Sequence, residues 1–306
     1  ALSLDGLKNS HPIEQEVSNP SEIGQLFDAI SYSKGASILR MLEKFIGAET
    51  FRVGIQKYLA NHQYGNATTD DLWDALEVAS GQSVSSIMNS WIKQTGYPVI
   101  QIDDTEKTPT GFKLTLTQDR FIYEHLLDPD AVNDKNWEIP ITARNSDGEM
   151  TSELMVESKA TITVPSPIKS DWFKLNPDQT GFYRVNYTQS GWARLQTAIE
   201  QKVISPTDRL GLQNDAYSLA RAGYLPVTQF LDLAKSYADE SEYPVWSDLS
   251  SNINNLYNLI SDQPYHDDFT TYARNIFILA GRNIGWRSRP GEGDQDALLR
   301  STLLTN

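Results

Sequence analysis

The spacing of apolar residues changes twice along this chain, and that change limits the possible folds more than any other feature. Apolar side chains recur every three or four positions before residue 97 and again after residue 188, which is the period of one face of an α-helix. Between these regions apolar and polar residues alternate, as they do in a strand with one buried face. The 306 residues are too many for one ordinary domain, so the sequence predicts a multidomain α+β protein.

The first part, residues 1–97, is predicted to be helical. Thr68 precedes an apolar stripe and Gly81 follows it, and these residue types favour the start and the end of a helix. Similar stripes predict three more helices, so that the four cover about residues 33–47, 49–62, 69–80 and 84–94.

The second part, residues 98–187, is predicted to be an antiparallel β-sandwich. The segment from Phe112 to Thr117 alternates strictly, and Asn145-Ser-Asp-Gly148 is a plausible hairpin turn. Two more short strands are expected at the end of this part, near residues 172–175 and 182–187. Short alternating segments separated by frequent turns are typical of a sandwich.

The third part, residues 188–306, returns to the helical period. Pro206 opens one apolar stripe and Gly223 closes it, as expected for the two ends of a helix. The joints between stripes are short, so neighbouring helices should pair in antiparallel fashion. Stacked pairs of this kind build an α-solenoid, and we expect the start of one here.

Composition removes several functional classes. A net charge of −14 argues against a nucleic-acid surface, which needs clustered lysine and arginine. The chain has no cysteine, which excludes disulfides, thiolate metal sites and cysteine nucleophiles. No apolar run reaches the roughly 18 residues of a transmembrane helix. None of the four histidines stands four residues from another, so the chain has no His-Glu-x-x-His zinc motif.

Several short segments, spread in order over the chain, share one resemblance. They are Ser10-His-Pro-Ile13, Phe27-Asp-Ala-Ile-Ser-Tyr-Ser-Lys-Gly-Ala36, Ala67-Thr-Thr-Asp-Asp-Leu-Trp73, Trp91-Ile-Lys-Gln-Thr-Gly-Tyr-Pro98, Gly181-Phe-Tyr-Arg-Val-Asn-Tyr187 and Pro290-Gly-Glu-Gly293. The ordered set resembles the aminopeptidase N family of zinc metallopeptidases (gluzincins), with the puromycin-sensitive, cytosolic branch nearest. The resemblance implies the helical end of a thermolysin-like catalytic domain, then a β-sandwich, then the start of a helical, solenoid-like domain.

The same resemblance implies an activity that this chain cannot carry out alone. Members of the family remove the N-terminal residue from peptides, using a zinc ion held by two histidines and a glutamate, with a second glutamate as general base. These motifs are not found in the sequence, so zinc is expected in a parent enzyme and none in this chain alone. Peptide substrates and a missing N-terminal catalytic half are the implied partners, and the location is expected to be cytoplasmic.

One catalytic residue of the family maps onto the chain. It is the tyrosine of the Ser-Tyr-x-Lys-Gly motif, here Tyr32, and the resemblance implies that its hydroxyl donates a hydrogen bond to the tetrahedral intermediate. A phenol stays protonated at neutral pH and can make such a donation. The plainer alternative is a half-buried aromatic residue that caps its helix. Lys34 and Gly35 are interpreted as structural, the lysine in solvent and the glycine at a close contact.

Five other residues carry structural predictions. Trp91 and Tyr97 are expected to pack between the helical remnant and the sandwich. Arg209, Asn214 and Asp215 either face a substrate cavity or form internal hydrogen bonds, and the internal role is favoured.

A second function remains open at this point. Because the metal ligands are missing, the chain is also compatible with a non-catalytic peptide- or protein-binding module derived from the same family. If the chain is a fragment, the face that packs on the missing half should be apolar and exposed, and we then expect a tendency to associate.

Overall fold

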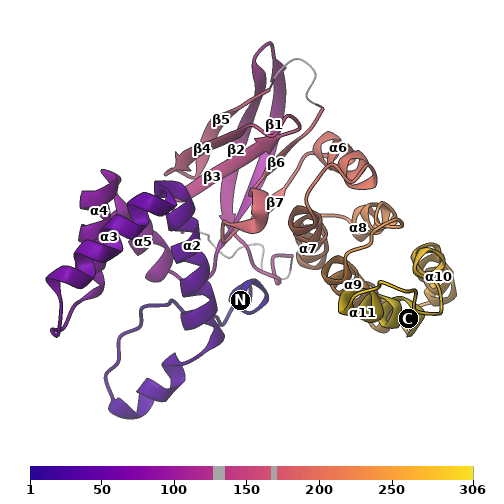
Figure 1. Cartoon of the computed structure of the whole chain (residues 1–306), viewed down its shortest axis with the longest axis horizontal. Coiled ribbons are helices and arrows are strands. Elements are labelled where there is room, and N and C mark those ends of the chain that lie inside the picture. Colours follow the sequence, from indigo (N-terminus) through magenta and orange to yellow (C-terminus); the bar gives the residue numbers. More distant parts are fainter. Residues whose placement is uncertain (127–134, 167–170, 306) are drawn as a thin grey trace. The chain divides into compact units, whose positions relative to one another are not determined.

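The chain forms two compact units, Ala1–Thr188 and Gln189–Asn306. A computed structural model describes residues 1–126, 135–166 and 171–305, and Figure 1 shows its helices and strands. In the part of the chain that is described, no helix is both long enough and apolar enough to cross a lipid bilayer.

The four helices predicted for the first part are confirmed to within two residues. They are α2 (Gly35–Ile46), α3 (Ala48–Asn61), α4 (Thr69–Ser80) and α5 (Val84–Ile92). At the start of α4, Thr68 and Asp71 form a reciprocal capping box, and Gly81 ends the helix in a left-handed conformation with φ +67°. Both local signals in the sequence therefore act as expected.

Three short helical segments before α2 were not predicted. They are α1 (Leu2–Asp5), the 3₁₀ helix η1 (Pro20–Leu26) and the π-helical turn η2 (Ile30–Lys34). None is long enough to show a helical period in its apolar residues. In Figure 1 the segment between α1 and α2 forms a long indigo loop, and its last turn, η2, runs directly into α2.

The middle region contains two small sheets (Figure 1). One has the strand order β5-β2-β1-β7 and the other the order β4-β3-β6. The hairpin predicted at Asn145 is confirmed, because β3 and β4 pair in antiparallel fashion on either side of it. The strands are β1 (Pro98–Thr108), β2 (Gly111–Arg120), β3 (Ile139–Asn145), β4 (Met150–Met155), β5 (Lys159–Pro165), β6 (Phe173–Leu175) and β7 (Arg184–Asn186), with a short turn η3 (Pro177–Gln179) between the last two.

Two features of these sheets differ from the prediction. Strand β1 was missed, because its second half, from Asp103 to Thr108, is polar and largely exposed and shows no alternation. Strand β7 runs parallel to β1, with Val99 opposite Arg184, so the prediction of purely antiparallel pairing is wrong at this pair. A parallel neighbour needs a long connection, and here most of the middle region lies between the two strands.

An aromatic cluster joins the helices of this unit to its strands. Trp91 on α5 is fully buried, and its indole N–H donates to the carbonyl of Glu138 at 2.9 Å. Tyr97 is also fully buried and stacks on Phe121 at a centroid distance of 5.3 Å. Phe182 meets the rings of both Trp91 and Tyr97 edge-on. The packing role predicted for Trp91 and Tyr97 is confirmed.

The second unit is helical in the part that the structure describes. The apolar stripe predicted between Pro206 and Gly223 is confirmed as helix α7, and Gly223 ends that helix with φ +83°, as its sequence position predicts. The helices are α6 (Gln189–Glu200), α7 (Pro206–Ala222), α8 (Val227–Lys235), α9 (Tyr243–Leu259), α10 (His266–Ile284) and α11 (Asp294–Thr305).

Polar residues predicted to bond internally in this unit do so. Arg209 forms a buried two-point ion pair with Glu240, with Nε–Oε2 at 2.5 Å and Nη2–Oε1 at 2.9 Å. The side-chain amide of Asn214 donates to Asp248 at 3.3 Å, and Asp215 is buried. The internal role is therefore confirmed for Arg209 and Asn214.

Candidate functional site

Tyr32 lies in the π-helical turn η2, immediately before α2. Its side chain is 61% exposed, and its ring lies 6.1 Å from the exposed ring of Phe27. Among the described residues, its hydroxyl forms no hydrogen bond. Such turns are uncommon in proteins and occur frequently at functional sites. This exposure does not fit the alternative of a half-buried helix cap, and it leaves the hydroxyl free to donate to a ligand.

Asp28 fixes the start of this turn. Its Oδ1 accepts a hydrogen bond from the backbone N–H of Ser31 at 2.8 Å, and its carbonyl accepts one from the N–H of Tyr32 at 3.1 Å. The other carboxylate oxygen, Oδ2, lies 2.5 Å from Nε2 of His11. One aspartate therefore connects the backbone that carries Tyr32 to a histidine near the N-terminus of the chain.

His11 presents both ring nitrogens to oxygen atoms. Nε2 faces Asp28, and Nδ1 lies 2.8 Å from the carbonyl oxygen of Pro12. Burial favours the neutral ring, but the Pro12 carbonyl and the Asp28 carboxylate outweigh it, so the pKa of His11 is raised. Burial likewise opposes the charged form of Asp28, but hydrogen bonds from Ser31 and His11 hold the pKa of that carboxyl below its usual range. Both shifts favour an ion pair.

Lys34 ends the turn and is fully buried, so the prediction that it lies in solvent is wrong. Its Nζ lies 2.9 Å from Oδ2 of Asp5 and donates to the carbonyls of Gly96 at 2.8 Å and Gln94 at 3.3 Å. Burial lowers the pKa of Lys34, and Asp5 acts in the opposite direction. The Asp5 carboxylate offsets the cost of burying the charge of Lys34. Asp5 is 29 positions away in the sequence, 34 − 5, so no local sequence pattern could reveal this contact.

The space around Gly35 also differs from expectation. A Cβ placed there would meet no atom within 4 Å, so the predicted close contact is wrong. A cavity of about 330 Å³ is lined by Ser33, Ser37 and Arg40, but Gly35 is not among its lining residues.

The residues around Tyr32 do not form a zinc site. Within the described ranges, no three histidine, cysteine, aspartate or glutamate side chains gather where they could hold a metal ion. His11 is engaged by Asp28, and His62 lies 3.9 Å from Asp71 on a different helix. The donor set among the described residues therefore does not fit a zinc ion.

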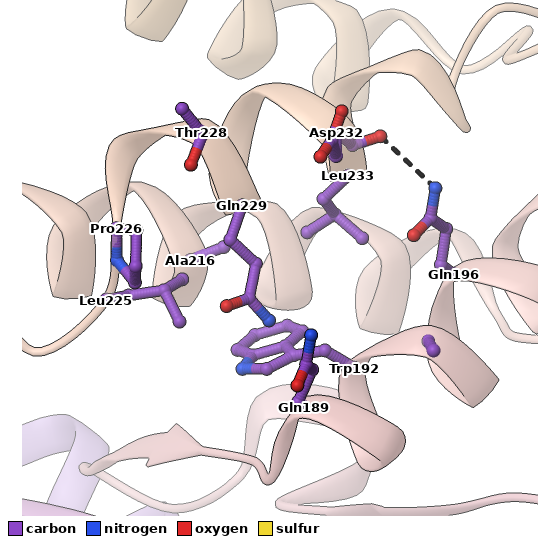
Figure 2. Close-up of a pocket in the computed structure, with 11 residues that line it drawn as sticks. Gln189, Trp192, Gln196, Ala216, Leu225, Pro226, Thr228, Gln229, Asp232 and Leu233 are labelled. Atoms are coloured by element: carbon purple, nitrogen blue, oxygen red, sulfur yellow. Dashed lines mark hydrogen bonds between the residues drawn. The ribbon is translucent and has the colours of Figure 1, made fainter.

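The helical unit contains a second concave surface, shown in Figure 2, and Tyr32 is not among the residues that line it. It is a groove of about 340 Å³ among α6, α7 and α8. Gln189 and Gln196 on α6 and Gln229 on α8 line it, with the buried ring of Trp192 at its base. The Gln196 amide donates to the carbonyl of Asp232 at 3.2 Å across the groove.

Comparison with known families matches both ends of the chain. Residues 1–91 match the Peptidase family M1 domain, and residues 172–306 match the ERAP1-like C-terminal domain. Peptidases of the M1 family are generally zinc-dependent. Tyr32, Asp28 and Lys34 all lie within the first matched segment.

Similar curated proteins are named aminopeptidases. The chain is 37% identical to Aminopeptidase M1 of Arabidopsis thaliana over 99% of the chain and 35% of that protein. It is 36% identical to Aminopeptidase 2, mitochondrial, of Saccharomyces cerevisiae over 99% of the chain and 31% of that protein. It is 34% identical to Puromycin-sensitive aminopeptidase of Caenorhabditis elegans over 99% of the chain and 32% of that protein.

The chain spans about a third of the length of these relatives. The likeness nevertheless runs through nearly the whole chain, and the two family matches follow one another in the order that the sequence motifs predict. On these grounds the chain belongs to the M1, or aminopeptidase N, family of peptidases.

Proposed function

We propose that this chain is part of a zinc aminopeptidase that removes N-terminal residues from peptides. We propose further that Tyr32 is the residue through which this chain takes part in catalysis. The observation that carries the proposal is the free, exposed hydroxyl of Tyr32 on a supported π-turn within the segment that matches the peptidase domain. The zinc ligands and the general base come from a part of the enzyme outside these residues.

The role proposed for Tyr32 is to stabilise negative charge. When water adds to the carbonyl of the scissile peptide, the carbonyl oxygen becomes an oxyanion, and the phenol donates a hydrogen bond to it. A donor held in place before the reaction strengthens its bond as charge develops, and one such donor typically contributes about 10²–10³-fold in rate. The hydroxyl forms no competing bond among the described residues, so it is available for this purpose.

The partner of this chain is proposed to be the zinc-binding part of the peptidase. Four large apolar side chains close to Tyr32 in sequence are exposed: Leu4, Val17, Ile23 and Phe27. A contiguous exposed apolar patch marks an interaction surface, and we propose that these four side chains contribute to one. A chain without its partner should associate through this surface, and sedimentation at rising concentration tests that expectation.

The proposed layout has three domains. Residues 1–97 are the helical end of a thermolysin-like domain, residues 98–187 a β-sandwich and residues 188–306 the start of a solenoid-like helical domain. Contact between Phe112 on β2 and Phe173 on β6, at a centroid distance of 5.1 Å, supports a sandwich, because it joins the two sheets. Successive helices of the second unit support a solenoid, and we propose a cytoplasmic location.

A chimera tests the proposed function. The 306 residues replace the homologous segment of the Arabidopsis Aminopeptidase M1, which they match over 99% of their length, and hydrolysis of a leucine or alanine fluorogenic amide is measured. We expect the chimera to be active and to hold one zinc ion. We expect the 306-residue chain alone to be inactive and free of stoichiometric zinc. A folded chimera with bound zinc but no hydrolysis would contradict the proposal.

A non-catalytic binding module is the second candidate, and the groove in Figure 2 is the observation that favours it. Its glutamine amides are suited to pairing with the backbone of a peptide. This function predicts that the chain binds peptides in metal-free buffer, and that Gln229→Leu weakens binding. Calorimetry that detects no binding to a mixed peptide pool would remove this candidate.

A further inference from the structure

The turn that carries Tyr32 is held at both ends by residues from one stretch of chain. At its start, the Asp28 carboxylate lies 2.5 Å from His11. At its end, the Lys34 ammonium lies 2.9 Å from Asp5. Asp5 and His11 both precede the turn in a single connection, so Tyr32 stands between two ion pairs that tie it to the same segment.

This support has a physical reason. Uncommon backbone conformations persist where the surrounding structure over-determines them, and a π-turn is uncommon. At the start of η2, Asp28 accepts the N–H groups of both Ser31 and Tyr32, through its carboxylate and its carbonyl respectively. The Asp28 side chain therefore holds the backbone of Ser31, the residue immediately before Tyr32.

We propose that His11 is a positioning residue, whose positively charged ring holds Asp28 and thereby aims the hydroxyl of Tyr32 at the substrate carbonyl. This inference rests on the role proposed for Tyr32. A neutral imidazole has one N–H group and the imidazolium has two. Because Nε2 faces Asp28 and Nδ1 faces the Pro12 carbonyl, only the imidazolium donates to both oxygens.

The groups around His11 favour its charged form. Asp28 is in direct contact, and Asp5 acts at longer range while it is itself paired with Lys34. The side-chain amide of Gln15 lies 2.9 Å from Nδ1, and half a turn of that amide presents its oxygen to the ring N–H. The raised pKa of His11 means that its stabilising effect is complete below the ordinary value of 6.5 and is lost as pH rises through the folded-state pKa.

The first experiment uses the chimera and separates kcat from KM. We expect His11→Gln to lower kcat by about tenfold to a hundredfold, the effect of a misplaced catalytic group, with KM changed less than twofold. His11→Lys should restore most of the turnover at neutral pH. It should also move the alkaline limb of the kcat–pH profile to higher pH, because an ammonium group stays charged to about pH 10.

His62 provides a matched control. It also pairs with an aspartate, Asp71, and the side chains of that pair are 28% and 37% exposed, against 30% and 34% for His11 and Asp28. The distance in the control pair is 3.9 Å, and Asp71 belongs to the capping box of α4 rather than to the Tyr32 turn. His62→Gln should leave kcat and its pH profile unchanged.

The outcomes distinguish this inference from the proposed function. If Tyr32→Phe lowers turnover but His11→Gln changes neither kcat nor the pH profile, the positioning role is wrong and the role of Tyr32 stands. If Tyr32→Phe leaves the turnover of an active chimera unchanged, the catalytic role proposed for Tyr32 is wrong, and the inference about His11 is wrong with it. A general loss of stability without rescue by His11→Lys would also contradict the positioning role.

A measurement on the unsubstituted 306-residue chain covers the case in which His11→Gln does not fold. The ring signals of Tyr32 are assigned in NMR spectra by their loss in Tyr32→Phe, and those of His11 are followed through its titration. We expect the Tyr32 signals to shift with the midpoint of His11. Tyr32 signals that stay constant while His11 titrates would overturn the proposal.

Discussion

Each unit of this protein buries an ion pair, and the two pairs are used differently. In the helical unit, Arg209 and Glu240 form hydrogen bonds with each other and with further residues of the same unit. Arg209 also donates to the carbonyl of Ile204 at 2.7 Å, and the hydroxyl of Tyr237 donates to the carbonyl of Arg209 at 2.7 Å. Each of these contacts joins one helix or loop of the unit to another, so the pair stabilises the packing of the unit.

In the first unit, the buried pair of Asp5 and Lys34 borders an exposed tyrosine. Lys34 ends the turn whose middle residue, Tyr32, is 61% exposed. Buried charge alone therefore does not mark a functional site, because structural ion-pair networks have the same chemistry. What distinguishes the Asp5–Lys34 pair from the Arg209–Glu240 pair is the exposed hydroxyl of Tyr32 on the uncommon turn beside it.

The largest expected effect comes from breaking either buried pair. Arg209→Met and Lys34→Met should each reduce the free energy of unfolding by about 3–5 kcal/mol, because each leaves a buried carboxylate without its partner. Urea denaturation of the chain measures the loss. In the chimera, at a temperature where both variants are folded, Lys34→Met should lower turnover much more than Arg209→Met. Equal losses of turnover would remove the contrast between the two pairs.

The second expected effect is a change of stability with pH, and this change has opposite signs in the two units. Burial opposes the charge on Glu240, but hydrogen bonds from Arg209 and nearby N–H groups lower the pKa of its carboxyl. Its stabilising effect is therefore present above the ordinary value of 4.5 and is lost as pH falls through the folded-state pKa. For His11 the effect is lost as pH rises, because its pKa is raised.

Hydrogen exchange can measure both of these changes of stability with pH on one sample. The N–H of Glu242 donates to the Glu240 carboxylate, and the N–H of Ser31 donates to Asp28. Protection should change by about tenfold for each unit of pKa shift, falling at Glu242 as pH is lowered and at Ser31 as pH is raised. Protection at Ser31 that stays constant while His11 loses its proton would contradict this difference between the two units.

A smaller loss of stability is expected when a helix cap that the sequence predicted is removed. Thr68→Ala removes the N-cap of α4 and should destabilise the first unit by about 1 kcal/mol, because the N–H of Asp71 loses its acceptor. Thermal unfolding of the chain measures this change. Turnover of the chimera should be unaffected, since Thr68 touches none of the residues that hold the Tyr32 turn. A matching loss of turnover would mean that the turn depends on general stability.

Local signals explain how much of this fold could be predicted. Helices such as α4 have an apolar period, a capping residue and a terminal glycine within one short segment, so their bounds were predicted closely. Strand β1 was missed because its second half carries no apolar alternation. The parallel pairing of β1 with β7 depends on residues far apart in the chain, which no local pattern records.

The candidate site shows the same limit. Tyr32 was identified by its resemblance to a family motif, whereas the residues that support it were not. His11 lies in the Ser10-His-Pro-Ile13 segment and Asp28 in the segment that contains Tyr32, so both were visible as motif residues without a role. Their roles depend on a contact across 17 positions, 28 − 11, and the burial of Lys34 depends on Asp5 in the same way. Only the folded chain brings these charges together.

The most direct test of the account is the turnover of the chimera with Tyr32→Phe. This change removes one hydroxyl that is bonded to nothing among the described residues, so the free energy of unfolding should stay the same. The account predicts that kcat falls by about 10²–10³-fold, with KM nearly unchanged. A folded variant whose kcat equals that of the parent chimera would contradict the central claim that Tyr32 acts in catalysis.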